Sequence, residues 1–273
     1  MIEIESKAQG AELTSIKVDG VEKLHDGKKD WNRHAPVLFP IVGQVKNGET
    51  VIEGNLYKMG QHGFARDMEF EKIKENSYVL RANEETLKKY PFKFELYVSY
   101  EVIKNKIITK YRIINKDENQ MAFGLGAHPA FVCDYSNGMY KLEFEYEEEN
   151  IQIYQLENGL IKENPEQANN FIDKNIIRLN KGTFKNDAII MKNINSNKIF
   201  LKKDENEILE LDFKGFPYIA IWSKPNAPFI CIEPWYNTAD KVNSNGIFEE
   251  KENLIKLLPN QEFNCEYCVE FFK

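Results

Sequence analysis

Four short fragments of the sequence place titratable side chains among glycine, alanine, proline or aromatic residues. They are residues 61–66 (QHGFAR), 126–131 (GAHPAF), 184–189 (FKNDAI) and 231–235 (CIEPW). Together they supply two histidines, an aspartate and a glutamate from four distant stretches of the chain. Histidine and carboxylate side chains have pKa values that suit proton transfer near neutral pH. The fragments therefore predict an acid–base site that is assembled from different strands or loops.

Glu233 is the carboxylate whose surroundings are most informative. It follows the apolar run 229–232, which predicts a strand that this carboxylate ends, and Trp235 stands two residues later. Burying an isolated charge is costly, so a carboxylate in such surroundings is either paired or functional. An aromatic ring beside it suits a sugar site, because the C–H faces of pyranose rings pack on indole rings. We therefore expect Glu233 to act in chemistry and Trp235 to contact a substrate.

The two histidines of these fragments occupy similar settings. His128 stands between small residues and Pro129, where the backbone is fixed and a ligand can come close. His62 precedes Gly63 and a strand-like stretch, although Gly63 also suits a plain turn or bulge. Taken alone, His128 is equally consistent with a buried side chain that has only a structural role, and for His62 the structural role is the stronger interpretation.

Three further charged residues are candidates whose individual signal is weaker. Asp187 precedes an apolar strand, and by itself it is typical of a turn. Arg66 lies in the same fragment as His62 and could reach an anionic ligand or form an ion pair. Arg33 precedes an apolar segment, and by itself it is a surface cation.

The elements that must position these side chains are strands, because the dominant hydrophobic period is two. Apolar and polar residues alternate over 92–102 and again over 107–113, with a turn at Lys104 and Asn105 between them. Similar alternation over 140–146 and 199–213 predicts further strands, and Asp19-Gly20 is a strong hairpin signal. Short helical pieces are expected only after Asn83 and within 248–258. The prediction is an all-β fold, a large antiparallel β-sandwich formed by one domain over 1–273.

The composition excludes several classes of partner. The formal net charge of −7 argues against a general nucleic-acid or anionic-membrane binder, because both functions need a basic face. The N-terminus has no signal-like apolar run, and the most apolar segments are too short to span a bilayer. We expect a cytoplasmic protein.

Cys265 and Cys268 form a C-x-x-C, but a period of two points the thiols to opposite faces, so no metal or redox site is predicted there.

Taken together, in this order, the motifs resemble the aldose 1-epimerase (galactose mutarotase) family, particularly the branch that contains LacX-like proteins and hexose-6-phosphate mutarotases. The matching segments are RHAPVLFPIVG, QHGFAR, KKYPFKFELYVSYEV, GAHPAF, FKNDAI and IEPW, and they extend from Arg33 to Trp235. The resemblance implies a β-supersandwich whose sugar cleft lies on a concave face. One departure is that residues 41–49 replace the G-R-x-A-N-R segment of galactose mutarotases, which leaves the choice between hexose and hexose phosphate open.

The resemblance also implies a role for individual residues. His128 matches the family's general acid and Glu233 its general base. His62 and Asp187 match the pair that orients the sugar hydroxyls, and Arg33 matches an arginine of the LacX and hexose-phosphate branch.

Anomers interconvert when a base removes the proton of the anomeric hydroxyl while an acid protonates the ring oxygen. This chemistry needs no electron transfer, metal or covalent nucleophile, so we predict no cofactor and no metal. We expect His128 and Glu233 to converge on opposite edges of one sugar-sized hollow, and a neighbouring carboxylate to raise the pKa of His128.

Two alternative functions are a glycoside hydrolase that uses Asp187 and Glu233, and a sugar-binding protein without activity. The expected partner is a small sugar, and the sequence makes no prediction of oligomeric state.

Overall fold

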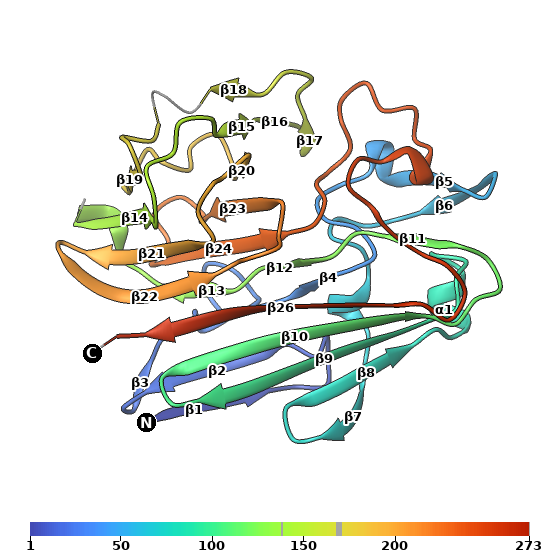
Figure 1. Cartoon of the computed structure of the whole chain (residues 1–273), viewed down its shortest axis with the longest axis horizontal. Helices are drawn as coiled ribbons and strands as arrows, with labels where there is room; N and C mark the ends of the chain where they lie inside the picture. Colours follow the sequence, from blue (N-terminus) through green and yellow to red (C-terminus); the bar gives the residue numbers. More distant parts are fainter. Residues whose placement is uncertain (138, 168–170, 273) are drawn as a thin grey trace.

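Two large antiparallel sheets pack against each other through a shared core in the computed structural model, which describes residues 1–137, 139–167 and 171–272 (Figure 1). Within these ranges, the first sheet has the strand order β19 (Ile176–Arg178), β14 (Tyr140–Phe144), β21 (Lys198–Lys203), β22 (Asn206–Asp212), β26 (Glu262–Phe271), β10 (Lys106–Asn115), β9 (Phe94–Ile103), β8 (Ser77–Arg81) and β7 (Glu71–Lys74). The second has the order β18 (Glu166–Gln167), β15 (Gln152–Tyr154), β20 (Ile189–Lys192), β23 (Tyr218–Trp222), β24 (Phe229–Trp235), β12 (Gly126–Ala127) and β4 (Val37–Leu38), and β13 (Ala130–Val132) also pairs with β24.

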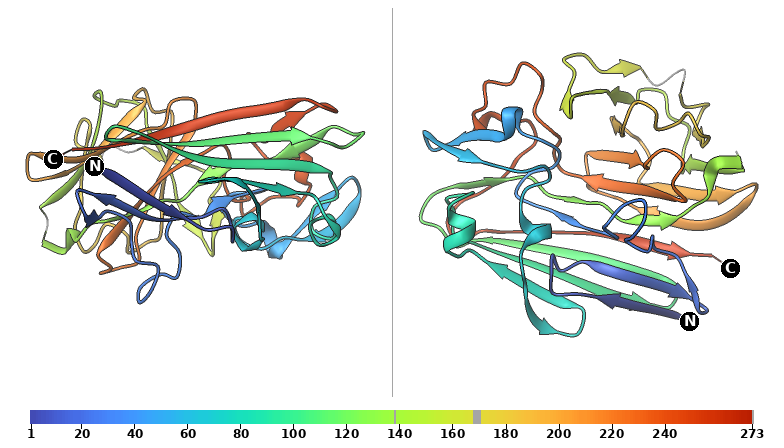
Figure 2. Two further views of the ribbon diagram at one scale, coloured as in Figure 1. Left: turned by 90° about the horizontal axis from the view of Figure 1, so that it is seen from below. Right: turned by 180° about the vertical axis from the view of Figure 1, so that it is seen from behind.

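Smaller elements surround the two sheets. The additional strands are β1 (Ile2–Ser6), β2 (Leu13–Val18) and β3 (Val21–Glu22), β5 (Glu49–Ile52) and β6 (Asn55–Lys58), β11 (Met121–Phe123) and β25 (Ile255–Leu257), and β16 (Leu156–Glu157) and β17 (Leu160–Ile161). The short helices are α1 (Glu84–Leu87) and the 3₁₀ turns η1 (Lys46–Gly48), η2 (Ala65–Asp67), η3 (Tyr135–Asn137) and η5 (Phe248–Glu250). Figure 2 shows that β1 and the end of β26 lie on the same side of the molecule. No helix within the described ranges is long and apolar enough to cross a membrane.

The all-β prediction is confirmed, and so are several of its local details. Strands β9 and β10 form the expected hairpin, and strands β2 and β3 are joined at Asp19-Gly20. The side chain of Asn83 caps α1 in a capping box with Thr86. Cys265 and Cys268 lie at positions of opposite parity on β26 and so point to opposite faces of the sheet, as the alternation predicted.

Three local predictions are corrected by longer-range contacts. Within 248–258 only η5 is helical, because Ile255–Leu257 pairs with β11 as a strand. The strand-like stretch after Gly63 forms the 3₁₀ turn η2. Glu233 does not end a strand but lies within β24, which continues to Trp235.

Strand β24 explains how the second sheet carries a site. All seven of its residues are buried, so both faces of this strand are covered. Ile230 and Ile232 face the main core between the sheets. The alternate positions, from Cys231 through Glu233 to Trp235, therefore point to the other face, where smaller apolar clusters surround them. The single carboxylate of β24 is thus held on a face that is buried by neighbouring loops rather than by the first sheet.

Candidate active site

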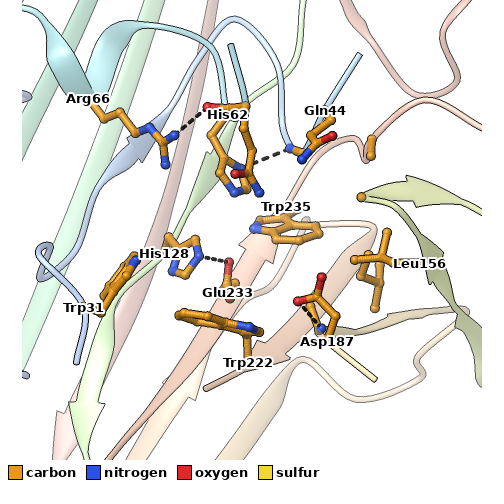
Figure 3. A pocket seen from close by; sticks show the side chains of 16 residues that line it. Trp31, Gln44, His62, Arg66, His128, Leu156, Asp187, Trp222, Glu233 and Trp235 are labelled. Carbon is orange, nitrogen blue, oxygen red and sulfur yellow. Dashed lines mark hydrogen bonds and ion pairs between the residues drawn. The ribbon is translucent and has the colours of Figure 1, made fainter. Parts of the chain in front are cut away.

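A cavity of about 250 Å³ lies over this outer face of β24 (Figure 3). Of the seven residues that the sequence singled out, six line it: His62, Arg66, His128, Asp187, Glu233 and Trp235. Arg33 is not among the residues that line it. Drug-sized ligands occupy cavities of roughly 300–1,000 Å³, so this one suits a smaller molecule.

His128 and Glu233 meet at the base of the cavity. Strands β12 and β13 both pair with β24, and residues 128–129 form the connection between them, so that connection lies opposite the middle of β24. As a result, His128 Nε2 stands 3.2 Å from Glu233 Oε2, and both side chains are buried (Figure 3). The two groups converge as expected. They are adjacent, however, rather than on opposite edges of the hollow.

Burial controls the charge of this pair. It lowers the pKa of His128 to about 3, and the positive charge of Arg66 acts in the same direction. Burial raises the pKa of Glu233 well above its ordinary value; the indole N–H of Trp235 opposes this shift, although its geometry is too poor for a hydrogen bond. The expectation that a neighbouring carboxylate raises the pKa of His128 is therefore wrong, because desolvation outweighs that attraction. Both shifts favour a neutral imidazole and a neutral carboxylic acid.

His62 is held by two reciprocal hydrogen bonds with one glycine. The backbone N–H of Gly43 donates to His62 Nδ1 (3.0 Å), and the backbone N–H of His62 donates to the carbonyl of Gly43 (2.7 Å). Nδ1 accepts a hydrogen bond, so the proton of the neutral ring resides on Nε2. Burial lowers the pKa of His62 well below its ordinary value. His62 is therefore a neutral ring that presents an N–H donor.

The two hydrogen bonds between His62 and Gly43 require glycine at position 43. Gly43 has a φ of +71°, and a Cβ there would stand 2.8 Å from the Cα of Ala239. His62 itself has a φ of +63°, an uncommon conformation for a residue with a side chain. The two hydrogen bonds to Gly43 stabilise this backbone conformation.

The remaining charged residues lie at the rim or outside the cavity. Asp187 is exposed, and its carboxylate accepts a hydrogen bond from the backbone N–H of Ala188 (2.8 Å). Arg66 donates to the carbonyl of Gln61 (2.7 Å), and burial lowers its pKa to about 10. Arg33 instead forms an ion pair with Asp67 (2.7 Å).

Comparisons with known proteins agree with this architecture. A sequence profile described as aldose 1-epimerase matches residues 2–252. The chain belongs to the aldose 1-epimerase family. The chromosomal LacX protein of Lactococcus lactis subsp. lactis is 33% identical, over 94% of this chain and 92% of its own length. The resemblance to the LacX-like branch is thereby confirmed, and family membership makes the chain an isomerase of the mutarotase type.

Two solved structures share the whole fold of this epimerase-family chain. A galactose mutarotase related enzyme from Lactobacillus acidophilus superposes with a TM-score of 0.92 at 32% identity, covering 100% of this chain and 95% of that one. A galactose mutarotase-like protein from Lactobacillus casei gives a TM-score of 0.93 at 29% identity, covering 99% and 97%. The β-supersandwich that the resemblance implied is therefore confirmed.

The structure adds two aromatic residues of this epimerase-family site that sequence reasoning missed, Trp31 and Trp222. Together with Trp235, which the sequence singled out, they are the three tryptophans of the chain, and all three line the cavity. The ring of Trp31 stacks on that of His128, with centroids 4.8 Å apart and planes 29° from parallel. Trp222 meets His128 edge-on at 5.9 Å. Tryptophan is rare in this chain, and that rarity was the sequence signal that could have pointed to Trp31 and Trp222 as residues of the site.

Two further segments reach the cavity from unexpected places. Gln44 comes from the segment that replaces the G-R-x-A-N-R motif. Leu156 and Gly159 come from the β16–β17 hairpin. The hairpin thus covers the cavity in addition to facing solvent.

Proposed function

We propose that this protein interconverts the α and β anomers of a free aldohexose, with His128 and Glu233 as its acid–base pair. The observation that carries the proposal is the 3.2 Å contact between these two buried side chains inside a small cavity. The hydroxyl oxygen at the anomeric carbon and the ring oxygen are bonded to the same carbon. An acid and a base that serve these two oxygens must therefore be neighbours, as His128 and Glu233 are.

The pair needs only one mobile proton. Transfer of the carboxyl proton of Glu233 to His128 across their contact forms an imidazolium and a carboxylate without changing the net charge of the buried site. The carboxylate of Glu233 then takes the proton of the anomeric hydroxyl, and His128 gives its proton to the ring oxygen. The bond between the ring oxygen and the anomeric carbon breaks as the carbonyl forms. Rotation about the C1–C2 bond and the reverse transfers close the other anomer.

The other side chains would orient the sugar. His62 offers a fixed Nε2–H donor because its Nδ1 is already occupied by Gly43. Asp187 at the rim offers a carboxylate acceptor, and Trp235 offers an apolar ring surface. We infer that His62 and Asp187 bind hydroxyl groups, as the family resemblance implied, and that Trp235 packs on a face of the ring.

The charges around the cavity favour a neutral sugar over a hexose phosphate. Arg66 is the one lysine or arginine among the described residues that line the cavity, and Asp187 and Glu233 share that lining. Arg33, the second candidate for binding phosphate, is engaged by Asp67. A phosphate carries nearly two negative charges and favours clustered arginines in bidentate geometry. We therefore propose a free hexose as the substrate.

Polarimetry tests the proposal directly. Freshly dissolved α-glucose and α-galactose should reach equilibrium faster with the enzyme than without it, and α-glucose 6-phosphate should be accelerated less. His128→Asn should lose most of the activity, by ~10²–10⁴-fold, because one proton-transfer group is removed. Faster turnover of the phosphate would refute the neutral substrate. Sugar binding without acceleration would indicate a binding protein, and release of reducing sugar from a chromogenic glycoside would indicate a hydrolase.

We also infer that one domain spans 1–273 and that the protein acts in the cytoplasm. The main core cluster supports the first inference, because it includes Ile2 and Phe271 together with residues of both sheets. Limited proteolysis that released a stable folded fragment would contradict it.

A further inference from the structure

A third buried side chain lies beside the acid–base pair and has no part in the proposed reaction. Cys231 precedes Glu233 by two residues on β24, so both side chains point to the same face of the sheet. One ligand atom from each of His128, Cys231 and Glu233 lies within 4.8 Å of the other two. All three residues are buried, and Cys231 forms no disulfide.

The polar atoms of this trio are also available. Both carboxylate oxygens of Glu233 and the Nδ1 atom of His128 are buried and make no hydrogen bond with any described residue. Buried polar atoms in folded proteins are normally satisfied, so unpartnered ones at a cavity indicate a place for a ligand. The trio therefore combines a cysteine with independent signs of a binding site.

The chemistry of the three donors suits a small divalent cation. Imidazole nitrogen, carboxylate oxygen and thiolate sulfur are the ligands of tetrahedral zinc sites. In a tetrahedron with bonds of ~2.0 Å, nitrogen and oxygen ligands stand roughly 3.3 Å apart. His128 Nε2 and Glu233 Oε2 are 3.2 Å apart, close to that edge. The fourth position would face the cavity, where water can bind.

We propose that His128, Cys231 and Glu233 form a binding site for a borderline or soft divalent cation such as Zn²⁺, and that the bound ion arrests turnover. Binding forms three metal–ligand bonds, and the carboxylic acid of Glu233 and the thiol of Cys231 each release a proton to solvent as the oxygen–metal and sulfur–metal bonds form. The ion occupies the two groups that transfer protons in the proposed mutarotation, so the inhibitory half of this inference rests on the proposed function. Sugar and metal compete because both need the same atoms.

The binding half is tested without any activity measurement. Protein freed of metal with a chelator is titrated with Cd²⁺, and the ultraviolet thiolate-to-cadmium charge-transfer band is recorded. One equivalent should produce the band in the wild type and in Cys268→Ala, a matched control at a half-buried cysteine on β26. Cys231→Ala should lack it. Cys231→Ser serves as a second variant, and circular dichroism checks that each variant is folded.

The inhibitory half uses Zn²⁺ in the polarimetric assay. Removing a residue that hydrogen-bonds to a metal ligand typically lowers the affinity for the metal ~10–100-fold. Removing the ligand Cys231 itself should therefore raise the inhibitory Zn²⁺ concentration at least about tenfold. Cys231→Ala should keep its metal-free rate, and excess glucose should relieve inhibition of the wild type. The proposal is overturned if the wild type gives no band at one equivalent, if the band persists in Cys231→Ala, or if Zn²⁺ inhibits that variant equally. If the wild type gives the band but does not catalyse mutarotation, the proposed function is refuted and the proposed metal site still stands.

Discussion

Replacing Glu233 by glutamine should have opposite effects on activity and on stability. Glutamine keeps the shape and the neutral form of a carboxylic acid, but it cannot accept the proton of the anomeric hydroxyl. A positioned general base contributes typically ~10²–10⁴-fold to a rate, equivalent to ~3–5 kcal/mol of activation free energy. We expect Glu233→Gln to lose turnover by this factor, because no other described carboxylate is in contact with His128.

The stability effect follows from the raised pKa of Glu233. Burial makes the folded protein hold the carboxyl proton to a higher pH than the unfolded chain does. The folded state then loses stability as the pH rises from the unfolded pKa through the folded pKa, at ~1.4 kcal/mol per pH unit within that window. Glutamine does not ionise, so the variant escapes this loss. Each kcal/mol corresponds to about 2–4 °C in melting temperature for a chain of 150–250 residues.

Two measurements on the same samples separate these effects. Polarimetry with fresh α-glucose, corrected for the spontaneous reaction, gives the rate, and thermal unfolding at pH 5 and pH 8 gives the stability. The variant should melt higher than the wild type at pH 8, with a smaller difference at pH 5. The exposed Glu118 provides the control, and Glu118→Gln should change neither quantity. A wild-type rate in Glu233→Gln would refute the base assignment, and a lower melting temperature at pH 8 would show that an ionised carboxylate stabilises the fold.

Three further predictions concern the other residues of the cavity. His62→Asn should raise KM several-fold with a smaller change in kcat, because a fixed donor to the sugar is lost; a loss confined to kcat in steady-state assays would contradict this role. His128 is buried with a pKa of about 3, so its contribution to the stability of the folded state should fall by ~1.4 kcal/mol per pH unit as the pH falls from about 6.5 toward 3, opposite in sign to the contribution of Glu233. Urea unfolding at pH 7 and pH 5 checks this, because His128→Asn should become more stable relative to the wild type at pH 5 than at pH 7. Because Trp31, Trp222 and Trp235 all line the cavity, glucose should change the tryptophan emission, and Trp222→Phe should reduce that change. An emission spectrum that saturating glucose leaves unaltered would place sugar binding elsewhere.

The local elements were predictable because their causes are local. Alternation over 92–113 and the turn at Lys104 and Asn105 indicate a hairpin whose partners are neighbours in sequence. Asn83 indicates the start of α1 because its side chain bonds to backbone groups only two and three residues away. Pairing with a distant strand overrides the local pattern at Ile255–Leu257. These residues pair with β11 as a strand, whereas the local pattern predicted a helix.

The sequence by itself determined the kinds of group available for chemistry, two histidines and two carboxylates, and the period of two that indicates strands around them. Only the tertiary structure decided that His128 touches Glu233, that Arg33 turns to Asp67, and that burial keeps the acid–base pair neutral. The physical reason is that side-chain alternation and turn chemistry depend on adjacent residues. Contact, burial and pKa depend on sheet register, which joins segments more than a hundred residues apart.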